Sequence, residues 1–204
     1  MAGDTPDGRT SSEPELYQLL RAGPGLSVLT GGQTGVDTLA AQAALDAVLS
    51  VHLVFPRGCR REDGPLTQER RALLTGAHAH QLPTASFRSR TWACVALADV
   101  VVLLDPAGGS GCEETRRAAA QLGRPLLCPD ESVLIAAQVS EWLRRNEARV
   151  LMVAGCRASV LERAGKDREL PAQLAVIMAG ARAYADALIR LPGIASDSTE
   201  DPPG

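Results

Sequence analysis

The stretch Leu26-Ser-Val-Leu-Thr-Gly-Gly-Gln-Thr-Gly-Val-Asp37 predicts a strand, a glycine-rich turn and the start of a helix. Its apolar run at 26–29 is typical of a buried strand, and a helical pattern begins near Val36. The first N–H groups of a helix have no partner within it, and the helix dipole adds positive charge beside them. The turn can therefore serve as an anion site. It matches neither Gly-x-Gly-x-x-Gly nor the P-loop, and a tight turn in which Thr34 caps the helix explains it equally well.

The composition is that of an ordinary globular protein. With 204 residues, 45% of them apolar and 22% charged, the chain suits one domain with a substantial core. Aromatic residues make up only 3%, so Ala, Val and Leu must fill that core, which suits helices packed on a parallel sheet. A net charge of −3 without a basic block argues against partners such as nucleic acid or a membrane surface.

The sequence indicates a cytoplasmic protein. Its N-terminus has no charged-then-apolar signal pattern, and no apolar run approaches the ~18 residues of a membrane span. The five cysteines contain no Cys-x-x-Cys pair, and the three histidines have no metal-binding spacing, so we expect free thiols and no metal site. Cys112, near a predicted helix start, is expected to have a lowered pKa and some reactivity.

Predicted strands and helices alternate along the chain. The strands are expected at 26–29, 51–55, 80–83, 99–105, 125–128 and 149–153. The helices are expected at 14–21, 36–49, 66–75, 86–98 with Ser86 as N-cap, 112–122, 133–145 and 170–189. This alternation predicts an α/β fold, a Rossmann-like open, mainly parallel sheet with helices on both faces. We expect one domain over 13–190, between a disordered segment at 1–12 and a disordered tail at 191–204.

Three of the predicted strands end in glycine-containing turns, at 31–35, 108–111 and 154–159. In an open parallel sheet the carboxyl ends of all strands lie on one edge, and ligands bind there. The sequence therefore predicts that the three turns meet in one crevice and bind a phosphate group. Arg88 and Arg90 lie just inside a predicted helix start, where the dipole disfavours cations, so at least one of them is a candidate anion ligand.

The order and approximate spacing of several motifs resemble the molybdenum-cofactor carrier family, within the SLOG superfamily of Rossmann-like nucleotide-ligand proteins. The motifs are Gly31-Gly-Gln-Thr-Gly-Val-Asp37, Pro56-x-Gly58 with Arg60, Glu62-Asp-Gly64, Arg90-Thr91 before Asp99, Gly108-Gly109, and Val153-Ala-Gly155 with Arg157. The resemblance implies a Rossmann-like fold and a phosphorylated, nucleotide-like small molecule as ligand, with the molybdenum cofactor (molybdopterin) as the specific candidate. It also implies a cytoplasmic location and a homo-oligomer.

Carried over position by position, the resemblance implies the ligand- and phosphate-binding residues Gly31, Gly32, Gln33, Thr34, Gly35, Asp37, Arg60, Glu62, Asp63, Arg90, Thr91, Gly108, Gly109, Ser110, Gly111 and Arg157. Structural roles remain open for several of them. Asp37 is also favourably placed at a helix start, and Arg60 with Glu62 and Asp63 is also typical of a solvated loop of ion pairs. The chain departs from the family pattern at five positions, which hold Cys59, Cys94, Met152, Cys156 and Ala158.

The phosphoribohydrolase branch of the same superfamily, which cleaves the base from nucleoside 5′-monophosphates, is a second relative. Its signature Pro-Gly-Gly-x-Gly-Thr-x-x-Glu is similar to Ala107-Gly-Gly-Ser-Gly-Cys-Glu-Glu-Thr115, where Thr115 stands at the position of the catalytic Glu. Glu114 lies one residue earlier, ~100° around the helix. We therefore expect a binding or carrier protein. The alternative is an N-glycosidic hydrolase that uses Asp37, Glu62, Glu113 or Glu114.

Overall fold

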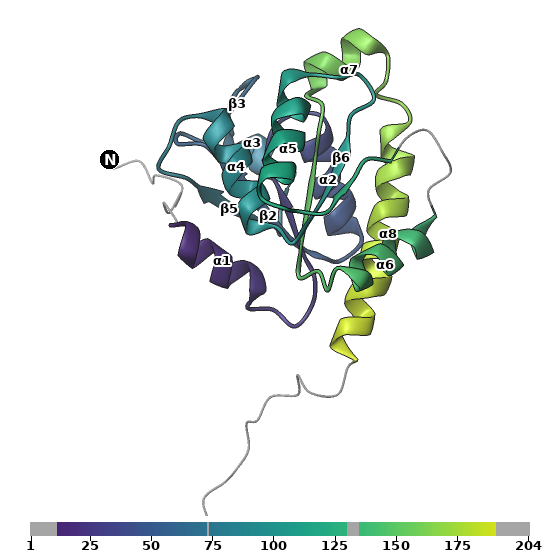
Figure 1. Ribbon diagram of the computed structural model, residues 1–204. Coiled ribbons are helices and arrows are strands. Elements are labelled where there is room, and N and C mark those ends of the chain that lie inside the picture. The colour runs from purple at the N-terminus through teal and green to yellow at the C-terminus, as the bar shows by residue number, and fades with distance from the viewer. Residues whose placement is uncertain (1–11, 73, 130–134, 191–204) are drawn as a thin grey trace, which may run out of the picture.

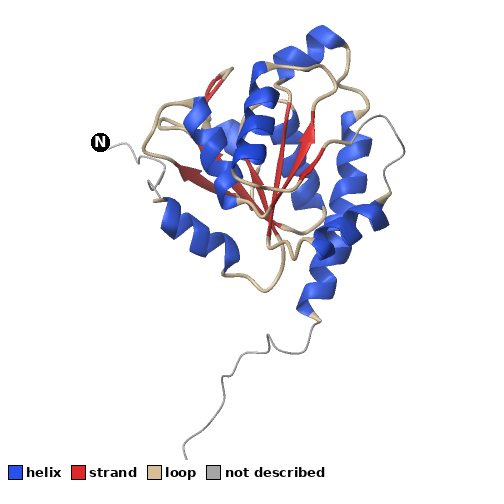
Figure 2. Ribbon diagram, in the orientation of Figure 1, coloured by secondary structure: helices blue, strands red, loops and turns tan. Residues whose placement is uncertain are grey.

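A six-stranded parallel sheet with helices on both faces forms the centre of the computed structural model (Figures 1 and 2). The model describes residues 12–190, except 73 and 130–134. The order of the strands in the sheet is β5-β2-β1-β8-β6-β7. This arrangement confirms the predicted Rossmann-like α/β fold. Apart from Ser12, which caps α1, the segments expected to be disordered lie outside the described residues.

The elements follow the predicted order. The strands of the sheet are β1 (Ser27–Thr30), β2 (Ser50–Phe55), β5 (His78–Gln81), β6 (Val100–Leu104), β7 (Leu126–Leu127) and β8 (Val150–Gly155). The helices are α1 (Glu13–Arg21), α2 (Val36–Asp46), α3 (Gln68–Ala72), α4 (Phe87–Leu97), α5 (Ser110–Gln121), α6 (Ala136–Arg145), α7 (Ala158–Ala164) and α8 (Leu170–Ile189). Two features were not predicted, namely α7 and a hairpin of β3 (Arg60–Arg61) and β4 (Gly64–Pro65).

The last strand, β8, lies in the middle of the sheet between β1 and β6. Met152 pairs with Leu29 on one side and with Val101 on the other. At the end of β8, a Cβ on Gly155 would lie 2.2 Å from the carbonyl oxygen of Leu104, so only glycine fits there. The carboxyl ends of three neighbouring strands thus lie side by side, which confirms that the three glycine-containing turns meet.

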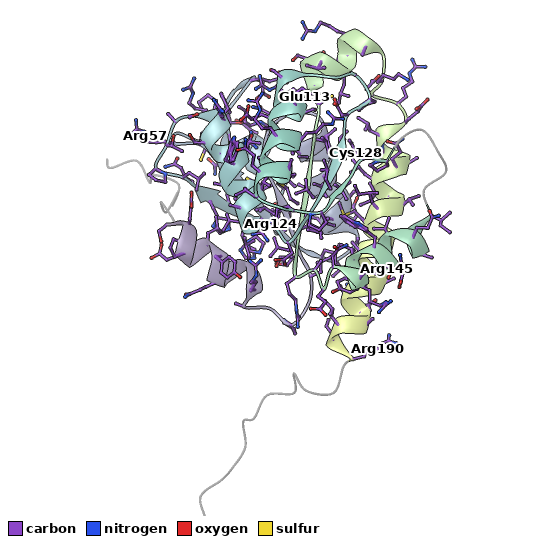
Figure 3. The ribbon with its side chains drawn as sticks, in the orientation of Figure 1. Arg57, Glu113, Arg124, Cys128, Arg145 and Arg190 are labelled. Atoms are coloured by element: carbon purple, nitrogen blue, oxygen red, sulfur yellow. The ribbon has the colours of Figure 1, made fainter. Side chains whose placement is uncertain are left out.

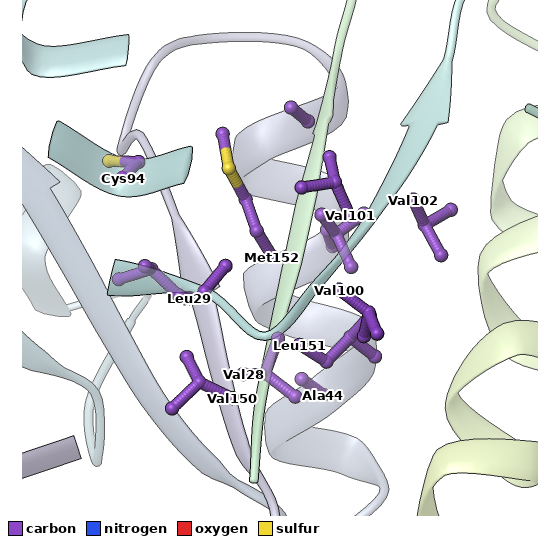
Figure 4. Packing of buried hydrophobic residues seen from close by; sticks show 14 of the residues in the cluster. Val28, Leu29, Ala44, Cys94, Val100, Val101, Val102, Val150, Leu151 and Met152 are labelled. Carbon is purple, nitrogen blue, oxygen red and sulfur yellow. The ribbon is translucent and has the colours of Figure 1, made fainter. Parts of the chain in front are cut away.

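Small and branched side chains fill the space between the sheet and the helices. The strand residues Val28, Val101 and Leu151 are fully buried, and Ala44 of α2 packs beside them (Figure 4). On the same face α8 packs against α2 and α6, and on the other α4 packs against α1 and α5. At Gly180 a Cβ would lie 2.4 Å from the carbonyl oxygen of Ala136, so α8 and α6 meet almost backbone to backbone. A core poor in aromatic residues permits this close layering.

Among the described helices, α8 is long and apolar enough to cross a membrane, with a mean hydropathy of 1.2 over its most apolar window. The expectation that no apolar run approaches that length is therefore wrong. Leu174, Ile177 and Ala181 of α8 are fully buried against the rest of the protein. Core helices of globular domains share this length and composition, so the helix is weak evidence for a membrane span.

Two histidines form a buried pair between the neighbouring strands β2 and β5. His52 Nδ1 lies 3.0 Å from His80 Nε2, and the two rings are stacked. Burial, together with the neighbouring histidines, lowers the pKa of His52 to about 3 and that of His80 to about 4. Both side chains are therefore neutral at pH 7 and resist protonation in the folded state.

We expect this pair to make the folded state sensitive to acid. Below the ordinary histidine pKa of ~6.5 the unfolded chain binds more protons, so stability falls as the pH drops from ~6.5 towards ~4. The fall is up to ~1.4 kcal/mol per pH unit for each histidine. Urea unfolding at pH 7, 6 and 5 measures it. The double variant His52→Gln/His80→Gln should show a much weaker pH dependence than the unaltered protein. His78→Gln removes only the exposed neighbour that adds to the lowered pKa values, so it should weaken the pH dependence less. Equal slopes for all three proteins would contradict the prediction.

Candidate functional site

A cavity of about 480 Å³ lies at the carboxyl ends of β1, β8 and β6. Its volume is in the range of small-molecule sites. Many residues singled out from the sequence line it, namely Gln33, Asp37, Arg90, Thr91, Gly108, Gly109, Ser110, Gly111, Glu114 and Arg157. The others lie outside its lining, and these are Gly31, Gly32, Thr34, Gly35, Arg60, Glu62, Asp63 and Glu113.

The backbone of the first glycine turn is occupied by hydrogen bonds within the protein. The N–H groups of Gly32, Gln33, Thr34 and Val36 donate to Thr30 Oγ1, Asp37 Oδ2, Gln33 Oε1 and the carbonyl oxygen of Cys156, at 3.0–3.2 Å. A phosphate cannot bind these amides without displacing those bonds. The anion site expected at this helix start is therefore closed, because Asp37 and the chain after β8 already satisfy it.

The side chain of Gln33 has one end fixed and the other unpaired. Its Oε1 accepts the N–H of Glu62 at 2.8 Å and that of Thr34 at 3.2 Å, which fixes the orientation of the amide. Its Nε2 is buried and has no hydrogen-bond partner in the described part of the chain. A buried donor without a partner is costly. Because Gln33 lines the cavity, a ligand acceptor can satisfy this donor.

Asp37 and Arg90 form a buried ion pair beside Gln33. Arg90 Nη1 lies 3.4 Å from Asp37 Oδ2, and each side chain is less than a tenth exposed. Burial raises the pKa of Asp37, and the Arg90 guanidinium opposes that shift. A Cβ on Gly31 would lie 1.2 Å from Arg90 Nη1. Any side chain at position 31 would overlap the guanidinium of Arg90, so the residue there has to be glycine for a structural reason.

The second glycine turn is open where the first is closed. None of the described residues accepts a hydrogen bond from the N–H groups of 108–111, and no side chain caps the twelve-residue helix α5 that begins there. A Cβ at Gly108, Gly109 or Gly111 would meet nothing within 4 Å. Free amides at a helix N-terminus attract anions. This turn, which the resemblance implied to be the phosphate side, has the backbone needed for that role.

Arginine side chains add positive charge to the cavity. Arg88 and Arg90 of α4 line it, together with Arg157 and Arg163 on either end of α7. Arg157 lies over the ring of Phe87 at 5.6 Å, and Arg60 lies 5.7 Å from the same ring. Arg60 is exposed and does not line the cavity. Its predicted ligand role stays a prediction, whereas Arg157 is placed to reach a ligand.

Glu62 joins the β3–β4 hairpin to the rest of the site. Its carboxylate accepts hydrogen bonds from Thr34 Oγ1, from Ser159 Oγ at 2.5 Å and from the N–H of Ser159 at 3.3 Å. These bonds outweigh partial burial and lower the pKa of Glu62. The side chain caps the start of α7, and this structural role occupies its carboxylate. Asp63 pairs with Arg61 Nε at 3.3 Å.

The two acidic residues at the start of α5 are also engaged elsewhere. Glu114 accepts hydrogen bonds from Trp92 Nε1 at 2.5 Å and from Arg88 Nε at 2.8 Å, and these donors lower its pKa. It thereby ties α5 to α4. Glu113 is exposed (Figure 3), and it pairs with Arg116 at 3.3 Å. Glu114 is therefore held by its two donors, and Glu113 does not line the cavity.

Three residues that the sequence analysis did not connect form a cluster beside the cavity. Asp105, Cys112 and Cys156 place their ligand atoms within 4.8 Å of one another. Burial and the Asp105 carboxylate raise the pKa of the Cys112 thiol far above its usual value, so the expected lowered pKa is wrong. The helix N-terminus favours the thiolate, but burial and the Asp105 carboxylate disfavour it more strongly.

The comparison with family models identifies the relationship. The circularly permutated YpsA SLOG family matches residues 28–173, which is more than half of the chain. The chain belongs to this family. A comparison with curated proteins found no match. Among solved structures, a "putative molybdenum carrier protein" from Syntrophus aciditrophicus is similar with a TM-score of 0.57 and 21% identity, over 82% of this chain and 96% of that one.

These findings agree with the SLOG resemblance inferred from the motifs. At 21% identity the solved structure shows a shared fold and no more. In this SLOG protein the sequence analysis missed Phe87, Ser159 and Arg163 as lining residues. Both Ser159 and Arg163 lie on α7. The sequence analysis placed Ser159 in the turn at 154–159 and predicted no element at Arg163.

The ion pair of Asp37 and Arg90 yields a stability prediction. Arg90→Met is expected to destabilise the protein by ~3–5 kcal/mol, because it leaves the Asp37 carboxylate buried without its cation. In that background Asp37→Asn should recover part of the loss, since the amide oxygen still accepts the N–H of Gln33. Urea unfolding of the four proteins measures the coupling. Arg145→Met on the exposed side of α6 is the control (Figure 3). If the changes in unfolding free energy of the two single variants add up to that of the double variant, Asp37 and Arg90 are not coupled and the prediction is contradicted.

Proposed function

We propose that the protein binds a phosphorylated, nucleotide-like small molecule in this cavity and acts as a carrier of the molybdenum-cofactor carrier type. The observation that carries the proposal is the pairing of open backbone amides at 108–111 with the unpaired Nε2 of Gln33 in one cavity. The amides suit a phosphate group, and Gln33 suits an acceptor elsewhere on the same ligand.

The charges and groups lining the cavity support this ligand class. Arg157 can add a forked, charge-assisted hydrogen bond to a phosphate held by the open turn. Gln33 Nε2 offers a donor for an acceptor on a heterocyclic ring. Molybdopterin combines such a ring with a phosphate, so the residues present fit it, and in the form of the molybdenum cofactor it would bring molybdenum as cargo.

The placement of the candidate carboxylates argues against the hydrolase alternative. An N-glycosidic hydrolase needs a free acid near the sugar to stabilise an oxocarbenium-like transition state. Here Glu62 and Glu114 are held by hydrogen bonds, Glu113 is exposed, and Asp37 is paired with Arg90. Thr115, at the position of the catalytic Glu, donates to the carbonyl oxygen of Gly111 at 3.0 Å. A binding protein therefore fits the site better than an enzyme.

We also expect a cytoplasmic homo-oligomer without nucleic-acid or membrane partners. The net charge of −3 supports the absence of polyanion binding. An apolar groove of about 700 Å³ between α2 and α8, lined by Leu39, Ala175 and Ala179 among others, supports association of copies through that face.

Substitutions around the cavity test the proposal. Gly109→Val places a side chain over the open amides, and its Cβ would meet nothing within 4 Å, so it should abolish ligand binding and leave the fold intact. Arg157→Gln should weaken binding ~10–100-fold through the loss of a charged hydrogen bond. The measurement is the thermal shift with nucleoside monophosphates, dinucleotides and molybdopterin, and released base is assayed in the same samples.

Two matched variants serve as controls. Gly23→Val alters a glycine with equally open surroundings on the loop after α1, and should bind like the unaltered protein. Arg60→Gln removes the other arginine beside Phe87, and a loss equal to that of Arg157→Gln would assign Arg60 the ligand role that the resemblance implied. Release of base would overturn the carrier proposal, and unaltered binding in Gly109→Val would exclude the second turn as the phosphate site.

A further inference from the structure

Three potential metal ligands converge from three different parts of the chain. Asp105 follows β6, Cys112 lies in the first turn of α5, and Cys156 follows β8. The sulfur atoms of the two cysteines are 3.7 Å apart, and Cys156 Sγ lies 3.1 Å from Asp105 Oδ1. All three ligand atoms lie within 4.8 Å of one another. The three residues are not spaced like a metal-binding motif in the sequence, because only the folded chain brings them together.

The distances match those of a tetrahedral metal site. Two thiolates bound to Zn²⁺ at ~2.3 Å in tetrahedral geometry lie ~3.8 Å apart. A thiolate and a carboxylate oxygen on the same ion, at ~2.3 and ~2.0 Å, lie ~3.5 Å apart. The observed separation of 3.7 Å between the sulfur atoms needs no adjustment, and that of 3.1 Å between sulfur and oxygen needs a few tenths of an ångström.

The surroundings also suit a cation. Arg116 Nη1 donates to Asp105 Oδ2 at 2.6 Å, which orients the carboxylate and leaves Oδ1 beside Cys156 Sγ. Two thiolates and one carboxylate carry three negative charges, so a divalent cation and the Arg116 guanidinium together balance them. The two cysteine residues are only 2–3% exposed, which shields the cluster from bulk water.

From these observations the geometry points to a binding site for one divalent cation of the Zn²⁺ class, held by Asp105 Oδ1, Cys112 Sγ and Cys156 Sγ. On binding, the two thiol protons leave to solvent and two metal–sulfur bonds and one metal–oxygen bond form. Cys112 and Cys156 line the cavity, so the fourth coordination position is left for water or for a group of a bound ligand. Binding of the metal can be measured without any small-molecule ligand, so the test of this site does not depend on the proposed carrier function.

The nearest rival is a redox pair in which Cys112 and Cys156 form a disulfide. Their sulfur atoms would have to approach from 3.7 Å to the ~2.05 Å of a disulfide bond. A disulfide also gives the Asp105 carboxylate, which Arg116 holds beside the two sulfur atoms, no role. The carboxylate is a natural third ligand for a cation, which favours the metal site.

Metal titration tests the inference directly. Reduced, metal-free protein is titrated with Zn²⁺ against a chromophoric chelator, and we expect one Zn²⁺ per chain. Cobalt(II) should give the visible bands of a tetrahedral ion and sulfur-to-cobalt charge-transfer absorption. Cys112→Ser and Cys156→Ser should each lose that absorption in part and weaken Zn²⁺ binding by more than the ~10–100-fold cost of losing an outer-shell partner. Asp105→Asn should weaken binding while it keeps the sulfur-to-cobalt absorption.

Cys59→Ser is the matched control, because Cys59 lies on the loop after β2 and its sulfur faces Gln81, away from the cluster. It should bind Zn²⁺ like the unaltered protein. Circular dichroism of each metal-free variant separates loss of a ligand from loss of the fold, and the cobalt spectrum of the unaltered protein requires no variant. Failure of the reduced protein to bind Zn²⁺ or Co²⁺ would overturn the proposal, as would unchanged binding in both Cys112→Ser and Cys156→Ser.

Discussion

The placement of β8 between β1 and β6 is the constraint on which the site depends. Cys156, directly after β8, donates its N–H to the carbonyl oxygen of Leu104 at 3.3 Å, and its carbonyl oxygen accepts the N–H of Val36 at 3.0 Å. One residue thus joins the turns that follow all three strands. Gly155 is what allows this approach, because any side chain there would collide with Leu104 and Val36. Without β8 in the centre, the three turns would belong to separate regions of the sheet edge.

The two helix starts that meet at this edge are used differently. At α2 the carboxylate of Asp37 accepts the N–H of Gln33, and the chain after β8 accepts that of Val36, so the backbone is satisfied internally. At α5 the N-cap is Gly109, which has no side chain to offer, and the amides stay open. The first turn therefore contributes side chains to the cavity, and the second contributes backbone. A phosphate and a heterocycle need these two kinds of partner.

The fold was predictable because its signals are local and periodic. Val100–Leu104 reads as a buried strand, the strand ends are marked by glycine, and α8 was predicted with its observed bounds. The order of the strands was not predictable, since no local pattern states that β8 lies between β1 and β6. The short helix α7 and the β3–β4 hairpin were missed because their stability comes from tertiary contacts such as that of Glu62 with Ser159. The same dependence on the fold hid the cluster of Asp105, Cys112 and Cys156.

The departures from the related families make sense together once they are placed in the structure. Thr115 replaces the acid that hydrolysis requires, and its hydroxyl is directed into the α5 backbone instead. Cys112 stands where the phosphoribohydrolase signature has Thr, and Cys156 is one of the departures from the carrier pattern. Their sulfur atoms lie 3.7 Å apart, beside the Asp105 carboxylate. These changes remove the group that would attack a ligand and add soft donors that would hold one. This direction of change supports the binding function that we propose over hydrolysis, because a carrier needs groups that hold a ligand and a hydrolase needs one that acts on it.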